Sequence, residues 1–542
     1  VLSCLYSRAM PLYSRHLFLP PEIKGVTASK CRVREQSTGY NLHSTTILIT
    51  TYIIFMDKCS SNRDASRAKT LVDLPDGDRC SRAERVGVVI VGGGVAGLTA
   101  AKTLLDKGVK DFVVLEAQDR LGGRVHTIRQ GPVLVEAGAE WIHGGEKNPL
   151  YRLASSLRAV GGAAPEDVQE DRRVMTQDGE PSDPAPCDRV VTALMTECDN
   201  NGILEPYYNT GYGQYYVDRF PDVYGPGHDG AKGRAWLHLL EQMVKGEEGI
   251  DSWMDISALD ADEYIDLGED YNWADGFDTL VRHLEESIPK GHIRLNSPVS
   301  RILWNRSDDE VEVMTSDEGE ASYITSVVLV TVSLGFLKEE HENIFRPVLP
   351  DHFARNLQLA ELGVANKMQL GWPRTWWGTG PLQLFILWTS FDLDSDMDWL
   401  YSIVCIESVY NQAAVLEMFI MGENSRRMEK LPENTVRDHL LYLLRRVTKQ
   451  DVPRPTFFNR TTWGSNRWTR GSYSSFVSVA GARAGLRRRE ALATPIANAN
   501  GKTVVTWAGE HTHNTRYGTV DGAMATGERE AHRILNILNA NQ

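Results

Sequence analysis

The chain has 542 residues, of which 42% are hydrophobic and 24% charged, and its formal net charge is −14. Length and composition are those of a globular protein with two or more domains and a large core. The acidic charge argues against general nucleic-acid binding. Seven scattered cysteines without a Cys-x-x-Cys pair indicate neither a disulfide framework nor a zinc site.

Residues 1–85 are predicted to be an N-terminal extension that is disordered or not translated. Met56 opens a polar stretch that leads directly to the first strand, so we expect translation to start there. The apolar run Thr45–Met56 is too short to span a bilayer. Residues 1–35 weakly resemble a transit peptide. We identify no peroxisomal, secretory or retention signal, and therefore expect a cytoplasmic protein.

A β-branched run, a glycine turn and a helix start follow in the segment VGVVIVGGGVAGLTAAKTLL. This pattern predicts a dinucleotide-binding turn, in which Gly92 makes the tight bend, Gly94 admits a pyrophosphate and Gly97 lets helix and strand pack closely. The pyrophosphate would rest on the helix N-terminus, to which Ala96 belongs. Glu116 ends the next strand about 20 positions later and would accept the ribose hydroxyls, which disfavours NADP.

The stretch EAQDRLGGR, from Glu116 to Arg124, resembles the ExxxRxGGR extension of the flavin amine oxidase superfamily. The resemblance implies FAD rather than NAD as the cofactor. Arg124 would reach the phosphates as a charge-assisted donor, and Gly122 and Gly123 would let the chain pass close to the cofactor. The alternative is a surface loop with one arginine.

The next motif, VEAGAEWIHG, resembles the GATWIHG motif of animal polyamine oxidases. It implies that the backbone near Glu140 and Trp141 borders the flavin and that His143 lines the substrate tunnel. The alternative for His143 is a histidine satisfied within the core.

Two segments in the middle of the chain are unusual in composition. Residues 163–190 are rich in Pro, Asp and Gly and are predicted to form a mobile loop. From Glu247 to Asp275 there are eleven acidic residues and no basic one. Such a stretch could steer polycations toward a cleft, or it could be a solvated face.

The dinucleotide-binding pattern resumes with a helix that starts at Gly276. Four strand-like runs follow it, at His292–Leu295, Val299–Trp304, Val311–Met314 and Val327–Val332. By the resemblance, Val299 belongs to the cofactor site.

The run LGVANKMQLGW resembles the family's strand that carries a lysine hydrogen-bonded, through a water, to flavin N5. Lys367 occupies that position. A cationic Lys367 would favour a neutral substrate nitrogen by like-charge repulsion. The alternative is an edge-strand lysine that faces water.

The segment RGSYS resembles the GGCY-type segment that supplies a flavin-linking cysteine in monoamine oxidases. Ser472 stands at that position, which implies noncovalent FAD. Tyr473 would stand beside the substrate tunnel and offer its ring face to an amine.

The last motif, VVTWAGEHTH followed by TVDGAMATGEREA, resembles the family's FAGExT…GAxxSGxREA ending. It implies that Glu510 binds the ribityl region. A strand is predicted at Thr503–Ala508 and a helix at Thr519–Leu538. The positive end of this helix, at Thr519 and Val520, would stabilise the reduced flavin.

These motifs together predict an α/β protein of the flavin amine oxidase fold. Its Rossmann-type FAD-binding domain would be discontinuous in sequence and accompanied by a mixed α+β substrate-binding domain. We assign residues 86–145, 276–335 and 496–542 to the first domain, and 146–275 and 336–495 to the second.

The predicted function is the oxidation of spermine, N1-acetylspermine or spermidine at the carbon beside a secondary amine. Oxygen is the acceptor, and the products are a shorter polyamine, an aminoaldehyde and hydrogen peroxide. Two alternatives stay open: a monoamine or L-amino-acid oxidase, and a flavin-binding regulator without turnover. We expect no nucleic-acid partner and no membrane span, and the preferred polyamine and the oligomeric state stay open.

Overall fold

The run VVIV before the glycine turn forms strand β2 (Val88–Val91), and all four of its side chains are buried. It lies within a computed structural model that describes residues 83–163, 172–198, 202–259, 264–316, 321–485 and 489–540. The predicted N-terminal extension lies outside the described residues up to position 82, and Glu84–Arg85 at its end form strand β1 rather than a disordered segment.

Strand β2 is central in a six-stranded sheet whose pairs are parallel, apart from the one at the β23 edge. The strands, in spatial order, are β10 (Ile293–Arg294), β3 (Phe112–Leu115), β2, β14 (Val327–Val330), β24 (Thr503–Trp507) and β23 (Ile496–Ala497). Parallel strands need cover on both faces. The strands of this sheet come from segments that lie far apart in sequence, from Val88 to Trp507.

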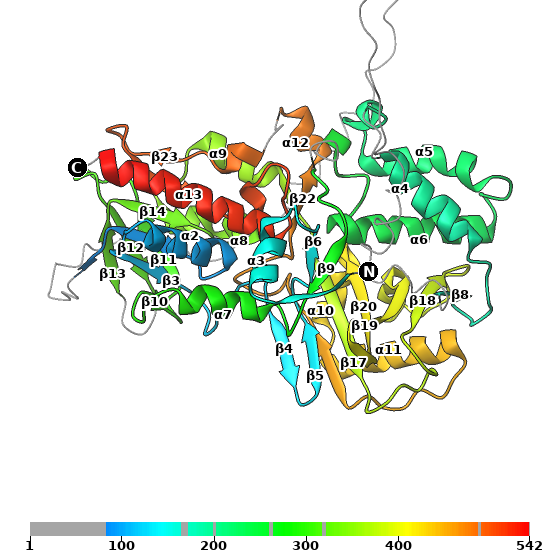
Figure 1. Cartoon of the computed structure of the whole chain (residues 1–542). Coiled ribbons are helices and arrows are strands. Elements are labelled where there is room, and N and C mark those ends of the chain that lie inside the picture. The colour runs from blue at the N-terminus through cyan, green and yellow to red at the C-terminus, as the bar shows by residue number, and fades with distance from the viewer. Residues whose placement is uncertain are drawn as a thin grey trace, which may run out of the picture. The chain divides into compact units, whose positions relative to one another are not determined.

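Two helices from opposite ends of the described chain cover one face of this sheet. Helix α2 (Val95–Asp106) packs along α13 (Val520–Ala540), and Figure 1 shows the two running side by side. A Cβ placed on Gly527 would lie 2.2 Å from the carbonyl oxygen of Ala96. The helices are therefore in backbone contact, which only a glycine at 527 permits.

A five-stranded sheet covers the other face. Its strands, in spatial order, are β1 (Glu84–Arg85), β13 (Ser322–Thr325), β12 (Val311–Thr315), β11 (Val299–Leu303) and β15 (Phe345–Arg346). The core between the two sheets also takes in apolar residues between Leu337 and Ala360, from α8 (Leu334–Ile344) and α9 (Asp351–Leu359). The sequence assigned this segment to the substrate domain, but its apolar side chains pack with the dinucleotide-binding sheet.

A second six-stranded sheet forms the core of the rest of the described chain. Its strands, in spatial order, are β21 (Phe457–Arg460), β17 (Ala365–Gly371), β20 (Gln412–Met421), β19 (Cys405–Val409), β18 (Gln383–Leu387) and β8 (Arg172–Thr176). Strand β8 lies within the segment predicted to be a loop. Its pairing with β18 is parallel, so part of that segment is ordered sheet rather than loop.

Helices enclose this sheet, with α5 and α6 drawn above it and α11 below it in Figure 1. They are α4 (Ala193–Cys198), α5 (Tyr212–Tyr224), α6 (Ala231–Glu248), α10 (Gly422–Lys430) and α11 (Glu433–Thr448). Helix α6 packs on β18 and β20, and Trp236, Trp388 and Trp399 are fully buried in the shared core. None of the described helices is long and apolar enough to cross a membrane.

Short elements connect these sheets. They are the hairpin β4 (Thr127–Gln130) and β5 (Val133–Glu136), the sheet β6 (Trp141–His143), β9 (Asp270–Trp273) and β7 (Val160–Ala163), the pair β16 (Ala360–Leu362) and β22 (Ser474–Val477), and helices α3 (Pro149–Ser156), α7 (Asp278–Glu286) and α12 (Val479–Arg483). Antiparallel pairing of β6 with β9 sets His143 directly opposite Asp270. This register brings the side chains of the two residues together.

Candidate active site

A cavity of about 910 Å³ extends from the glycine turn to strand β17 of the second six-stranded sheet. This volume is near the upper end of the usual range for ligand pockets. Every site residue predicted from the sequence lines the cavity except Gly97: Gly92, Gly94, Ala96, Glu116, Arg124, Glu140, Trp141, His143, Val299, Lys367, Tyr473, Glu510, Thr519 and Val520.

The glycine turn has the geometry that a dinucleotide requires. Gly92 has a φ of +110°, a conformation that favours glycine. A Cβ on Gly97 would lie 2.1 Å from the carbonyl oxygen of Gly92, which explains why Gly97 packs rather than lines the cavity. A Cβ on Gly94 would meet no atom within 4 Å. Gly94 also caps helix α2, so open space lies beside free backbone N–H groups, as an anion requires.

Glu116 stands at the same end of the cavity with its carboxylate held by the backbone. Its two oxygens accept hydrogen bonds from the Gly93 N–H at 2.7 Å and the Gln118 N–H at 2.8 Å. Burial raises the pKa of this carboxyl. The carboxylate is thus fixed in place, and its predicted contact with the ribose stays a prediction.

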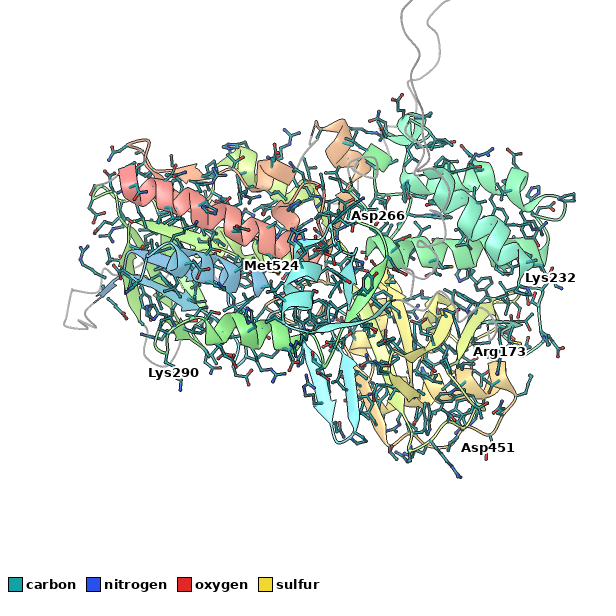
Figure 2. All side chains as sticks on the ribbon, viewed as in Figure 1. Arg173, Lys232, Asp266, Lys290, Asp451 and Met524 are labelled. Atoms are coloured by element: carbon teal, nitrogen blue, oxygen red, sulfur yellow. The ribbon has the colours of Figure 1, made fainter. Side chains whose placement is uncertain are left out.

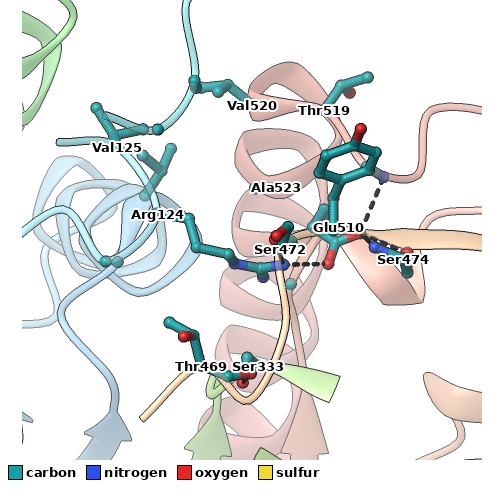
Figure 3. A pocket seen from close by; sticks show the side chains of 18 of the residues that line it. Arg124, Val125, Ser333, Thr469, Ser472, Ser474, Glu510, Thr519, Val520 and Ala523 are labelled. Carbon is teal, nitrogen blue, oxygen red and sulfur yellow. Dashed lines mark hydrogen bonds and ion pairs between the residues drawn. The ribbon is translucent and has the colours of Figure 1, made fainter. Parts of the chain in front are cut away.

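Arg124 and Glu510 form an ion pair in the middle of the cavity wall (Figure 3). Arg124 Nη1 lies 2.8 Å from Glu510 Oε1 and also donates to the Ser472 carbonyl. Glu510 Oε2 accepts from the Gly518 N–H at 2.8 Å and from Ser474 Oγ at 2.5 Å. Burial alone would raise the pKa of Glu510, but Arg124, His511 and the hydrogen bond from Ser474 lower it to about 2. The sequence predicted both residues, but not that they contact each other.

Lys367 lies on β17, which is flanked by β21 and β20, so the alternative of an edge-strand lysine is excluded. Its ammonium forms an ion pair with the Glu140 carboxylate, and Nζ lies 3.3 Å from Glu417 Oε1. Burial alone would lower the pKa of Lys367, but the two carboxylates more than offset it and the pKa is raised. Sequence reasoning missed Glu417 and assigned only the backbone near Glu140 to the site.

The glutamates change the electrostatics expected around Lys367. We expected a lone cation that repels a protonated amine. Two carboxylates around one ammonium instead leave this end of the cavity with a surplus negative charge when all three groups are ionised.

His143 faces the cavity and pairs with an acid. Its side chain is 41% exposed, which excludes a fully enclosed core histidine. Nδ1 lies 3.0 Å from Asp270 Oδ2. Burial alone would lower the pKa of His143, but the Asp270 carboxylate more than offsets it and raises the pKa. The Asp270 carboxylate therefore stabilises the imidazolium form of His143.

Tyr473 is fixed against helix α6 and the turn after it. Its hydroxyl donates to the Gly246 carbonyl at 2.7 Å. A Cβ on Gly249 would lie 2.2 Å from the Tyr473 ring, so the ring packs directly on that turn. Burial raises the pKa of the hydroxyl. Tyr473 thus presents a neutral ring on the cavity wall.

Ser472 binds the strand beside it. Its Oγ donates to the Ala365 carbonyl at 2.7 Å and accepts from the Ala365 N–H at 2.8 Å. None of the described residues that line the cavity is a cysteine. The described residues also contain no His, Cys, Asp or Glu cluster suited to a metal ion.

A wall of acids and aromatic rings lines the cavity between helix α6 and strand β9. The residues are Tyr212, Tyr216, Glu247, Glu248, Tyr264, Asp266, Glu269, Asp270 and Tyr517. The acids come from the stretch that the sequence singled out, and Figure 2 labels Asp266 among them. Asp260, Asp262 and Glu263 of that stretch lie outside the described residues. The four tyrosines carried no sequence signal that placed them here.

The family model for flavin containing amine oxidoreductase matches residues 95–206 and 214–535. This chain belongs to that family. It is an FAD-dependent amine oxidase, and the cavity fits the cofactor, with open space at the Gly94 turn and Glu116 held at the same end.

Among its relatives is the Bos taurus "Peroxisomal N(1)-acetyl-spermine/spermidine oxidase", which is 29% identical over 83% of this chain and 94% of that protein. The Homo sapiens protein of the same name is 30% identical over 83% and 95%. "Protein anon-37Cs" of Drosophila melanogaster is 28% identical over 83% and 90%. A solved structure of wild-type putrescine oxidase bound to putrescine superposes with a TM-score of 0.61 at 20% identity, over 84% of this oxidase and 100% of that chain, and confirms the fold.

Proposed function

We propose that this amine oxidase acts on polyamines. The observation that carries the proposal is the acidic and aromatic wall formed by Glu247, Glu248, Asp266, Glu269 and Asp270 with its tyrosines. A polyamine carries several cationic nitrogens separated by methylene chains. Carboxylates attract the nitrogens, and tyrosine rings pack on the methylenes or face a cation.

The other end of the same cavity would hold FAD. The Gly94 turn and the N-terminus of α2 bind its pyrophosphate, Glu116 its ribose, and Glu510 with Arg124 the region between. When bound, FAD accepts the two electrons of amine oxidation and passes them to oxygen. The protein holds the amine at that end, beside Lys367 and Tyr473, and away from bulk water.

A monoamine or L-amino-acid oxidase fits the described cavity less well. A monoamine has one cationic nitrogen to place along a wall of several carboxylates. An amino-acid substrate needs a cation for its carboxylate. Arg124, His143 and Lys367, which line the cavity, are already paired with carboxylates. Lys147, which also lines it, is exposed to solvent. The other alternative is a flavin-binding regulator without turnover. A peroxide assay tests it directly, because such a regulator would release no peroxide with spermine, N1-acetylspermine or spermidine.

We expect the double variant Asp266→Asn, Glu269→Gln to lose kcat/KM for spermine at low salt and to differ little from the parent at high salt. The Debye length falls from about 10 Å at 0.1 M salt to about 3 Å at 1 M, so steering by these acids is screened. Peroxide release at two ionic strengths measures this. The matched control is Glu285→Gln, Glu286→Gln, two exposed acids on α7. An equal loss in both double variants would show net charge rather than the acidic wall to be responsible.

We expect all FAD to leave the protein on heat or acid denaturation. Ser472 stands where a flavin-linking cysteine would be, and no described cysteine lines the cavity. The absorbance of supernatant and pellet after precipitation measures the release. Flavin that stays with the pellet would contradict noncovalent binding.

The cytoplasmic location is part of this proposal and rests on the sequence alone. Fluorescence microscopy of a full-length fusion tests it, and a punctate signal that coincides with a peroxisomal marker would overturn it.

A further inference from the structure

The Glu140–Lys367–Glu417 cluster contains two carboxylates for one ammonium, and all three groups line the cavity. Their side chains are 14%, 11% and 4% exposed, respectively. One carboxylate is therefore surplus, and little water screens it. A buried surplus charge is unfavourable unless a proton or a cation neutralises it.

The sheet register explains how this surplus is held in place. Gln369 lies opposite Glu417 on β20 and opposite Asn459 on β21. Asn459 Nδ2 donates to Gln369 Oε1 at 2.8 Å, and Gln369 Nε2 donates to Glu417 Oε2 at 2.6 Å. Glu417 is thus held between Gln369 and Lys367. Because Gln369 is neutral, the hydrogen bond orients the carboxylate without cancelling its charge.

Polyamine nitrogens are mostly protonated at neutral pH, since their pKa values lie near the reference of about 10.4 for lysine. An ammonium cannot give up a hydride from its neighbouring carbon while its lone pair is bound to a proton. The acidic wall attracts the cationic form, so the reacting nitrogen of the substrate reaches the site protonated. A group in the site that accepts this proton would prepare the substrate for oxidation.

We propose that the surplus carboxylate of the Glu140–Lys367–Glu417 cluster takes this proton. The N–H bond of the substrate ammonium breaks, an O–H bond forms on the carboxylate, and the nitrogen regains its lone pair. No electrons leave either partner, and the buried cluster and the reacting nitrogen become neutral together. This step rests on the proposed function, because it needs a cationic amine as the substrate.

Neighbouring groups favour a proton-binding role. Glu136 on β5, Glu407 on β19 and Tyr473 are the other titratable groups whose charges act on this cluster. Burial raises the pKa of Glu417 to about 7, despite the opposing effect of Lys367. Burial also raises the pKa of Glu136 to about 7. A carboxylate that binds a proton near neutral pH is suited to act as a general base, and Glu417 lines the cavity beside Lys367.

The test is the pH profile of kcat/KM for spermine in the FAD-loaded protein. We expect the wild type to reach a plateau above about pH 7, because below it the cluster already holds a proton. Glu417→Gln and Glu140→Gln each remove the surplus carboxylate, so both lose the plateau. Their kcat/KM should rise about tenfold per pH unit toward pH 10, because solvent must then deprotonate the amine. At pH 8 both should be slower by about 10²-fold.

A pH-indicator dye provides a second measurement in anaerobic single turnover. In the wild type the proton should appear in solution only after the substrate is oxidised. In either variant the proton should appear in solution before the substrate is oxidised. The matched control is Glu361→Gln, a partly buried glutamate on β16 that does not line the cavity and whose printed charge partners are outside the cluster. It should keep the wild-type profile and proton timing.

The outcomes separate the two proposals. A wild type that releases no peroxide with any polyamine overturns the proposed function. An active wild type whose two glutamine variants keep its profile and proton timing overturns the proton-acceptor role alone. A variant that does not fold leaves the other glutamine variant to decide.

Discussion

Replacing Lys367 by methionine is expected to slow turnover of the FAD-loaded enzyme by about 10²-fold or more, the usual scale for one positioned acid–base group. The substitution leaves Glu140 and Glu417 without their cation. Both carboxylates then favour the protonated form, and neither is free to accept a proton at neutral pH. Stopped-flow measurement of flavin reduction and reoxidation shows which half-reaction is slowed.

Two further variants test whether the loss of rate comes from removing the cation of Lys367. Lys367→Arg keeps the cation and should recover part of the rate. His143→Ala should act more mildly and mainly on KM, because His143 stands on the cavity wall beside Asp270. A Lys367→Met enzyme with wild-type rates in both half-reactions would leave Lys367 as a structural residue.

Replacing Arg124 by methionine is expected to lower the free energy of unfolding by about 3–5 kcal/mol and to abolish most FAD binding. Glu510 would stay buried without its cation, and such an uncompensated charge is strongly destabilising. Chemical unfolding of the apoprotein and the flavin content of the purified variant are the two measurements. Arg129→Met is the matched control, because its ion pair with Asp278 is exposed and should contribute less than about 1 kcal/mol.

The difference in the free energy of unfolding between wild type and Arg124→Met should depend on pH. The pKa of Glu510 is about 2 in the folded protein and near 4.3 when unfolded. The wild type therefore gains stability from the ionised group above pH 4.3 and loses it as the pH falls toward 2. Burial without Arg124 would raise this pKa instead. The gap between wild type and Arg124→Met should therefore narrow as the pH falls, and a gap independent of pH would assign the loss to packing.

Local patterns predicted the strands and helices that bind a dinucleotide, because their signals are short and periodic. The strand β14, predicted at Val327–Val332, forms at Val327–Val330, and the last helix starts within one residue of Thr519. Strand β8 was missed because its five residues stand among turn-forming ones, and its order comes from pairing with β18. The α8–α9 segment was misplaced because amphipathic helices do not indicate which sheet they cover.

The candidate site was predicted residue by residue but not as a set of contacts. Glu140 and Lys367 are 227 positions apart, and no local pattern indicates that their side chains meet. Glu417 is the one charged residue of β20, and only the register of β17 with β20 brings it to Lys367. Buried charge of this kind is set by tertiary pairing, so it needs coordinates to be recognised.

The backbone contact between α2 and α13 has a consequence for synthesis of the protein. The glycine turn leaves the ribosome long before Glu510, Thr519 and the helix that packs on Ala96. A nascent chain that ends before Thr503 lacks β24 as well as these residues, so its sheet is incomplete and its cofactor cavity is open. Cofactor capture is therefore a late event, and a partly made chain exposes an apolar sheet face that chaperones would have to cover.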